Sequence, residues 1–435
     1  MNVGVYLRPW NGTFYTKLSE KTFPKDQIIS ISEFKGVAQY WVGDSLFNGK
    51  DCNNCLFDNK EMMDIYIRCR FLRSLPIDIS FNLISKMTES IQTLFEKYKF
   101  KIFIGQLIDN YTLDIIERVA QKKNVKFISL VGHFINGYSR FSARGELTNL
   151  RRDVSKEEIS TVLSKITKED YKPNFDINKE QSRLLGIKYY YREKVKENYF
   201  SLLKHIKSDK YNYHYNTFTF KNKNLNDFIN KNTDFEFKKL NDVNIDRDSI
   251  YIPLHFTPEA TVDYWCEDPL CAFYEDSIID LICKSSHKLN FIIKEHPAMY
   301  MKRELAFYEK LVSFPNVQLV HPYENSNLLL NKVDNIYVYT GSVGVEALIR
   351  GKKVFSKTSN YYSDLHPNIS ITPYLSSTDV QKVVTEYDEK LFIKELLQGL
   401  IPAKLINNKK IMNSDLEGIS KYLKYYIEEC NILSI

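Results

Sequence analysis

The second half of the chain alternates short apolar runs with helical segments, and this alternation limits the possible folds more than any other feature. Apolar runs predict strands at 249–254, 290–294, 317–320, 336–339 and 353–355. Apolar residues at helical spacing predict helices between these runs, at about 272–286, 301–312, 324–332 and 344–350. Strands and helices in this order are typical of a doubly wound parallel sheet, which binds ligands beyond the carboxyl ends of its strands.

The first half shows a similar pattern with wider gaps. Strands are expected at 2–7, 101–105 and 125–131, with a helix at about 111–122 before the last of them. A helix between two strands predicts a right-handed parallel unit. The sequence therefore predicts an α/β protein with two Rossmann-like domains.

Composition suggests the domain boundaries. We expect an N-terminal domain over residues 1–150 and a C-terminal domain over residues 246–375. The intervening residues 151–245 are rich in Lys, Glu, Asn and Tyr and predict a helical insert. Residues 376–435 are expected to form helices that pack back toward the N-terminal domain.

The overall composition is that of a globular protein, with 43% hydrophobic and 26% charged residues. A formal net charge of +6 without an arginine-rich arm gives no reason to expect nucleic-acid binding. The N-terminus lacks the layout of a signal peptide, and no apolar run approaches the ~20 residues of a membrane helix. We therefore expect a cytoplasmic protein whose membrane contact is limited to peripheral contact with the inner membrane.

The seven cysteines are scattered and odd in number, as expected for reduced thiols in the cytoplasm. Cys52 and Cys55 have the spacing of half a zinc site, but no second Cys or His pair lies at a suitable distance along the chain. The sequence therefore predicts no metal site.

A turn of small residues, Thr340-Gly341-Ser342-Val343-Gly344, links the strand at 336–339 to a helix. Such a turn leaves backbone N–H groups free at the positive end of the helix dipole, where a phosphate binds well. Gly341 and Gly344 allow close approach, Thr340 and Ser342 add hydroxyl groups, and Glu346 can accept hydrogen bonds from ribose hydroxyls. Ser342 can equally serve only as a helix cap, and Glu346 only as a favourable charge at the helix start.

Two further loops follow predicted strands and contain polar residues suited to ligand binding. The segment 253–261 presents His255 and Glu259 between two prolines, which restrict the backbone. The segment Lys294-Glu295-His296-Pro297 supplies donors for a phosphate or a nucleotide base. His-Pro alone is weak evidence, because His321-Pro322 and His366-Pro367 also occur. His296 differs by its place between an apolar strand and a helix.

In combination and order, these three motifs resemble those of capsule and surface-polysaccharide synthesis proteins, a group that includes bacterial Kdo transferases. They are also similar to motifs of bacterial sialyltransferases that use CMP-activated sugars. The resemblance covers about residues 248–360 well, the first domain by layout, and the middle insert hardly at all. It implies a GT-B fold, in which two Rossmann-like domains face each other across a cleft. The C-terminal domain would bind the nucleotide donor, and the N-terminal domain would lie on the acceptor side.

The resemblance also implies roles for individual residues. His296 would contact the donor phosphate or cytidine, Ser342 and the adjacent amides would hold the phosphate, and Glu346 would hold the ribose. Together with the neighbouring motif positions, the predicted nucleotide-binding residues are His255, Lys294, His296, Pro297, Thr340, Gly341, Ser342, Gly344 and Glu346.

The function implied is transfer of a sugar, CMP-activated and similar to Kdo or sialic acid, from a nucleotide donor to a surface glycan or glycolipid. No metal and no cofactor other than the donor is expected. The catalytic base is left open, since related transferases often have an acidic loop in the first domain where this chain has Gly132-His133-Phe134. Either His133 takes that role, or the base lies elsewhere, for instance at Asp109 or Glu259.

Three alternatives fit the same sequence. The first two use the same architecture: a nucleotide-sugar epimerase of the UDP-GlcNAc 2-epimerase type, and a polyol-phosphate transferase that uses CDP-glycerol. The third is a non-catalytic glycan-binding protein. Polar residues at the ends of three strands favour an enzyme over this last alternative.

Overall fold

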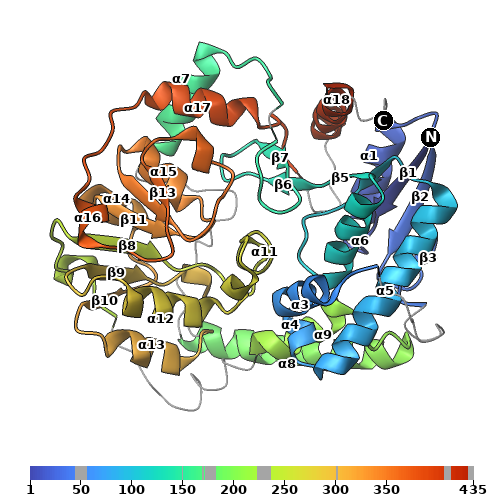
Figure 1. Ribbon diagram of the computed structural model, residues 1–435, viewed down its shortest axis with the longest axis horizontal. Coiled ribbons are helices and arrows are strands. Elements are labelled where there is room, and N and C mark those ends of the chain that lie inside the picture. The colour runs from blue at the N-terminus through green and yellow to red at the C-terminus, as the bar shows by residue number, and fades with distance from the viewer. Residues whose placement is uncertain are drawn as a thin grey trace. The chain divides into compact units, whose positions relative to one another are not determined.

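The computed structural model of the chain describes residues 1–44, 56–148, 150–168, 171, 183–222, 237–299, 302–405 and 413–429 (Figure 1). Cys52 and Cys55 lie outside these residues. The chain divides into two compact units, each with its own parallel sheet: unit 1 is Met1–Arg151, Glu197–Thr217 and Gly399–Ile435, and unit 2 is Arg152–Lys196 and Phe218–Gln398. The α/β class predicted from the sequence is confirmed. The expected boundaries treat each domain as one continuous segment, whereas each unit is built from separate segments.

The sheet of unit 1 has the order β3-β2-β1-β4-β5, and every neighbouring pair is parallel. Its strands are β1 (Asn2–Tyr6), β2 (Gln27–Ser32), β3 (Tyr40–Trp41), β4 (Ile102–Ile104) and β5 (Lys126–Ile128). The first strand and the strand near 101–105 are confirmed.

The strand expected at 125–131 is wrong as a single element. It divides into β5 and β6 (Leu130–Gly132), and β6 leaves the parallel sheet to pair antiparallel with β7 (Ser139–Phe141). Strand β2 was not expected, because its polar residues interrupt the apolar pattern of Gln-Ile-Ile-Ser-Ile-Ser.

Helices of unit 1 pack their apolar faces on this sheet. Leu83, Ile84, Met87, Ile91 and Leu94, which recur at helical spacing, are all buried. The helices of the first 151 residues are α1 (Gly12–Thr22), α3 (Asn59–Arg68), α4 (Arg70–Arg73), α5 (Ile77–Tyr98) and α6 (Tyr111–Lys122).

The C-terminal helix α18 (Asn413–Glu429) also belongs to unit 1 and packs on α1. Ile419 and Leu423 of α18 share a core cluster with Phe14 and Leu18 of α1. At the edge of this contact, Lys21 forms an ion pair with Glu417. Residues close to the two ends of the sequence therefore form one hydrophobic core.

The sheet of unit 2 has the order β10-β9-β8-β11-β12-β13 and is parallel throughout. Its strands are β8 (Ser249–Pro253), β9 (Asn290–Lys294), β10 (Val317–Val320), β11 (Asn335–Val338), β12 (Lys353–Ser356) and β13 (Ile369–Ile371). The five predicted strands are confirmed almost to the residue. The short edge strand β13 was not expected.

Helices cover both faces of this sheet. Helices α12 (Tyr274–Lys284) and α13 (Leu305–Val312) lie on one side of it, and α14 (Ser326–Lys332) and α15 (Val343–Ile349) lie on the other (Figure 1). Right-handed crossovers require this arrangement, because the strand order runs one way from β8 to β10 and the opposite way from β11 onward. The four helices predicted between the strands are therefore confirmed.

The remaining described helices connect or flank the two sheets. Helix α7 packs on α17 within unit 2. The segments are α7 (Lys156–Ile166), α8 (Arg183–Ile206), α9 (Tyr213–Asn222), η1 (Leu240–Asp242), α11 (Ala260–Asp263), η2 (Pro269–Ala272), η3 (Pro297–Met299), η4 (Ser363–Leu365), α16 (Ser377–Gln381) and α17 (Glu389–Gln398). Among the described residues, no helix combines the length and the apolar character needed to span a bilayer.

Candidate functional site

The strand order of unit 2 reverses between β8 and β11, which are hydrogen-bonded neighbours. In open α/β sheets, the loops that leave two such strands at their carboxyl ends separate and form a crevice that binds ligands. Here these loops contain His255 and Glu259 after β8, and the small-residue turn 340–344 after β11. The fold therefore brings two of the three predicted motifs to the position where sheets of this class bind ligands.

Direct contacts join these two loops. The hydroxyl of Thr340 donates to the carbonyl oxygen of Thr261 over 2.9 Å. The imidazole of His255 lies so close to Gly341 that a Cβ at this glycine would be 3.3 Å from the ring carbon Cε1. A larger residue at position 341 would therefore press on the histidine.

The third loop, after β9, reaches the same place. The rings of His296 and Phe256 have centroids 5.9 Å apart. The two histidines are also close enough that His296 contributes to lowering the pKa of His255. Within unit 2, the three motifs found in the sequence therefore adjoin one another.

His255 is held by its backbone, which leaves its ring for other contacts. Its N–H donates to the hydroxyl of Tyr274 over 3.0 Å, and its carbonyl oxygen accepts from Arg303 over 2.8 Å. The ring lies edge-on to the aromatic rings of Tyr274 and Tyr339. Burial lowers the pKa of His255 to about 3, so the imidazole is neutral at physiological pH.

His296 presents a defined tautomer. Its Nδ1 accepts a hydrogen bond from the backbone N–H of Ala298 over 3.1 Å. Burial lowers the pKa of His296 to about 4, although the nearby Glu295 acts in the opposite direction. A neutral imidazole that accepts at Nδ1 has its proton on Nε2, so His296 offers an N–H donor.

The same turn explains why His-Pro recurs in the sequence. His321 accepts from the N–H of Tyr323 over 3.3 Å, and His366 accepts from the N–H of Asn368 over 3.1 Å, in each case at Nδ1 and from two residues ahead. His133, which no proline follows, makes the same contact with Ile135. The motif thus stabilises a turn, and only the place of His296 after β9 relates it to the candidate site.

A buried ion-pair network under the site was missed in the sequence. Arg303 is fully buried and donates to Glu295, Glu275 and Thr257 over 2.7, 2.8 and 3.1 Å, in addition to the carbonyl of His255. Glu295 also accepts from the hydroxyl of Tyr308 over 2.6 Å. One guanidinium therefore ties the His255 loop to the His296 loop, with several charge-assisted hydrogen bonds. In the sequence, the signal that could have indicated this network is Glu295, a carboxylate that directly follows an apolar strand.

Lys294 lies near His296, and its charge helps to lower the pKa of that histidine. Its side chain is buried, and its ammonium donates to the carbonyl oxygen of Pro322 over 2.8 Å. This contact joins the end of β9 to the next loop, and the nucleotide contact expected of Lys294 stays a prediction. Pro297 begins η3 and fixes the backbone beside His296.

The small-residue turn differs from a simple helix cap. Ser342 occupies the N-cap position of α15, yet its side chain makes no capping hydrogen bond there. Gly344 lies directly against the hydroxyl of Tyr362, which donates to the carbonyl oxygen of Gly341 over 2.9 Å. Gly344 is therefore required by close packing, whereas the hydroxyl of Ser342 is not used as a cap.

Glu346 is almost entirely buried, near the start of α15. Burial raises the pKa of its carboxyl to about 7, and Arg350 lowers it only in part. A carboxyl that is partly protonated at neutral pH can both donate and accept hydrogen bonds, which suits contact with a hydroxyl group.

The three candidate bases lie in different settings. His133 is buried in unit 1 at the end of β6, and burial lowers its pKa well below the usual value. Asp109, also in unit 1, accepts a bidentate ion pair from Arg8. Glu259 is exposed in unit 2 and accepts from the hydroxyl of Thr261 over 2.9 Å. Of these, only Glu259 lies in a loop of the candidate site.

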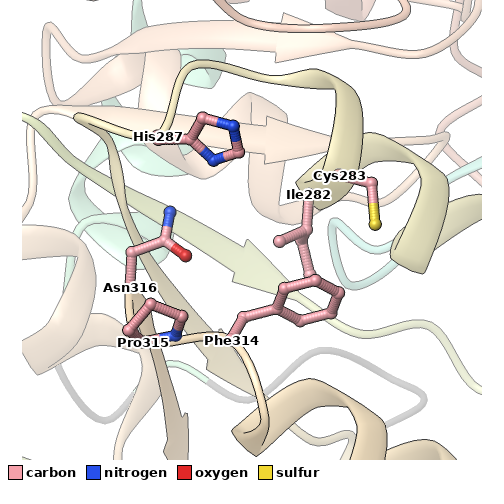
Figure 2. Close-up of a pocket in the computed structure, with 6 residues that line it drawn as sticks. All are labelled: Ile282, Cys283, His287, Phe314, Pro315 and Asn316. Atoms are coloured by element: carbon pink, nitrogen blue, oxygen red, sulfur yellow. The ribbon is translucent and has the colours of Figure 1, made fainter.

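A hollow of about 260 Å³ lies away from this site (Figure 2). It is lined by Ile282, Cys283, His287, Phe314, Pro315 and Asn316. Figure 2 shows Ile282 above the ring of Phe314, with His287 and Asn316 at the other end. These residues precede β9 and β10, so the hollow lies at the amino ends of the strands, away from the candidate site. In the described parts of the chain, no group of three His, Cys, Asp or Glu residues is arranged to hold a metal.

Residues 155–368, just under half of the chain, match the family of capsule polysaccharide biosynthesis proteins. The resemblance of the motifs to capsule polysaccharide synthesis proteins is confirmed, and their similarity to CMP-sugar sialyltransferases stays a prediction. The match begins well before residue 248, so it includes much of the middle segment that the motifs hardly covered. No curated protein matches the chain.

Solved structures similar to the chain include two kinds of enzyme. KpsC of Thermosulfurimonas dismutans, a beta Kdo 2,7 transferase, is 12% identical with a TM-score of 0.36, over 99% of this chain and 100% of that one. The beta Kdo 2,4 transferase of KpsC from the same organism is 10% identical with a TM-score of 0.36, over 91% of this chain and 89% of that one. The UDP-GlcNAc 2-epimerase of Methanocaldococcus jannaschii is 15% identical with a TM-score of 0.25, over 98% and 100%.

Proposed function

We propose that this chain is a glycosyltransferase of the GT-B type in capsule or surface-polysaccharide synthesis. It transfers a sugar from a nucleotide donor, CMP-linked and similar to Kdo or sialic acid, to a glycan or glycolipid acceptor. The observation that supports this most is the meeting of three polar loops at the strand-order reversal of unit 2, joined by the contact of His255 with Gly341 and the hydrogen bond from Thr340 to Thr261. The family match over residues 155–368 supports a role in capsule polysaccharide synthesis.

The groups in these loops suit an anionic donor without requiring a full positive charge. The Nε2–H of His296 and the hydroxyl of Ser342 are donors, and Glu346 can contact the ribose. In the transfer, the oxygen of an acceptor hydroxyl forms a bond to the anomeric carbon while the bond from that carbon to the phosphate oxygen breaks. The hydroxyl proton passes to the catalytic base, and the candidates for this base are Glu259, His133 and Asp109. Preorganised donors at the departing phosphate lower the barrier, because negative charge develops there in the transition state.

The donor is tested with a thermal-shift panel of CMP, CDP, UDP and GDP. A nucleotide that binds only the native state raises the melting temperature, and CMP is expected to give the largest rise. His296→Ala and Ser342→Ala are expected to abolish both the rise and sugar transfer while the melting temperature without nucleotide stays close to that of the wild type. His366→Ala is the matched control, since His366 forms the same turn on another loop. Turnover like the wild type in both site variants would contradict the proposal.

The alternative activities give different products. An epimerase would convert a UDP-sugar without any acceptor, and a polyol-phosphate transferase would consume CDP-glycerol. The proposed transferase consumes a CMP-sugar and needs an acceptor for glycan product. Chromatography of each donor, incubated with and without acceptor, distinguishes the three activities.

A further inference from the structure

A second group of polar residues lies at the carboxyl edge of the other sheet, in unit 1. Glu33 directly follows β2, Arg8 lies in the loop after β1, and Asp109 lies in the loop after β4. These three strands are neighbours in the order β2-β1-β4. His214 of α9, from the segment of unit 1 near residue 210, completes the group.

The floor of this group is a buried network of charges. Arg8 and Glu33 are 4% and 3% exposed. Arg8 binds Asp109 through both terminal nitrogens, one of them over 2.9 Å, and its Nε lies 3.6 Å from a carboxylate oxygen of Glu33. Glu33 in turn accepts from Asn110 over 2.9 Å and lies 3.0 Å from Nε2 of His214. Every charged group of the floor therefore has a partner of opposite charge or a polar partner.

The rim of the group is exposed and includes an aromatic ring. Trp10 is 46% exposed, although it packs edge-on against Phe34 and His214, with ring centroids 5.4 and 4.9 Å away. The guanidinium carbon of Arg8 lies 5.6 Å from the centre of the same ring. The side chains of Asp109 and His214 remain 31% and 19% exposed. Contacts on several sides thus hold an accessible indole beside an accessible carboxylate.

We propose that Trp10, Asp109 and His214 form a binding site for an uncharged saccharide, the acceptor of the reaction proposed above. The face of a fixed indole packs against the C–H groups of a sugar ring, and a carboxylate accepts hydrogen bonds from its hydroxyls. This assignment to the acceptor rests on the proposed function, whereas saccharide binding itself does not.

The charges of the group specify an uncharged ligand. Two carboxylates, Glu33 and Asp109, face one guanidinium, so the positive charge of Arg8 is already matched inside the protein. A phosphate or an acidic sugar would meet the exposed carboxylate of Asp109 and be repelled. The loops of unit 2, with histidine and hydroxyl donors, have the opposite character. The two sites therefore differ in the class of ligand that they take.

The test is saturation-transfer NMR on the full chain, which detects transfer of saturation from the protein to a bound glycoside. The neutral probes are the methyl glycosides of galactose, glucose and N-acetylglucosamine. The acidic probe is the methyl glycoside of N-acetylneuraminate. We expect transfer to the C–H protons of at least one neutral glycoside and none to the acidic one. Trp10→Leu and Asp109→Asn are expected to weaken this binding about tenfold, as for central contacts of a binding site. Tyr191→Leu removes an exposed aromatic ring outside the group and is the matched control.

The outcomes separate this inference from the proposed function. Trp10→Leu changes none of the charged residues of the buried floor. A loss of saccharide binding in this variant, with an unchanged rise in melting temperature by CMP, supports the inference. This holds even if Asp109→Asn fails to fold. Saccharide binding that is equal in Trp10→Leu and the wild type overturns it, as does transfer from the wild type to no neutral glycoside. If a neutral glycoside binds through Trp10 but no nucleotide raises the melting temperature, the proposed function fails and the saccharide site stands.

Discussion

Single residues decide how the loops of unit 2 are held, and Arg303 is the clearest case. Its guanidinium is fully buried and joins Glu295, Thr257 and the carbonyl of His255. Arg303→Met would leave the buried carboxylate of Glu295 without its counter-ion, which costs about 3–5 kcal/mol of unfolding free energy. Urea unfolding followed by circular dichroism measures this loss.

The double variant Arg303→Met with Glu295→Met serves as the comparison. Removing both charges should recover much of the lost stability, because no fully buried unpaired charge remains; Glu275, the other partner of Arg303, is 35% exposed. Lys284→Met breaks the exposed pair with Asp280 and should change the stability far less than Arg303→Met does. If Arg303→Met and Lys284→Met cost the same, the buried network does not stabilise the site.

The pH dependence of stability can be assigned to Glu346. Burial raises its pKa in the folded protein to about 7, above the usual value of 4.5. The folded state therefore keeps a proton that the unfolded state has released, so the contribution of Glu346 is complete below pH 4.5 and is lost as the pH rises through 7. Relative to the wild type, Glu346→Gln should gain up to about 3 kcal/mol in unfolding free energy between pH 5 and pH 8.

Urea unfolding of both proteins at pH 5 and pH 8 tests this sign. Other groups with shifted pKa values titrate equally in the two proteins and cancel in the difference. A difference between the two proteins that is independent of pH would show that Glu346 is ionised throughout this range.

At the scale of secondary-structure elements, the packing of α18 on α1 can be tested directly. Leu423 is fully buried in the core cluster that includes Leu18. Leu423→Ala should lower the unfolding free energy by about 2–5 kcal/mol, from lost transfer energy and the cavity left behind. Glu417→Ala breaks only an exposed ion pair on the same helix and should change stability by less than about 1 kcal/mol. Equal effects of the two substitutions would mean that α18 does not complete the core of unit 1.

The elements also show how far the sequence alone predicts this molecule. Strands β8 to β12 of unit 2 were predictable because each is an apolar run, and the carboxyl ends of β8, β9 and β11 located His255, His296 and Thr340. Strand β2 was not predictable, because polar residues interrupt its apolar pattern. The break between β5 and β6 was not predictable either, because no residue type marks it. The contacts of Arg303 with Glu295 and of Arg8 with Glu33 and Asp109 depend on chain segments that approach only in the fold. Lys294 has the residue type of a phosphate ligand, yet it donates to a carbonyl.

At the scale of the whole chain, each sheet presents its own polar group at its carboxyl edge. The group of unit 2 offers neutral donors suited to an anionic nucleotide, and the group of unit 1 offers a carboxylate and an exposed indole suited to an uncharged sugar. In the function that we propose, the group of unit 2 binds the donor and the group of unit 1 binds the acceptor. The central claim concerns unit 2: one nucleotide contacts the loops after β8, β9 and β11 at the same time.

Amide hydrogen exchange of the full chain, with and without CMP, tests this claim most directly. Backbone amides that a ligand covers or orders exchange more slowly, and mass spectrometry of peptides locates them. We predict slower exchange in three separate peptides, which cover 254–261, 295–299 and 340–346. The exchange of all three should slow over the same range of CMP concentration. Slower exchange in only one of these loops, or in none of them while CMP binds elsewhere, would contradict it.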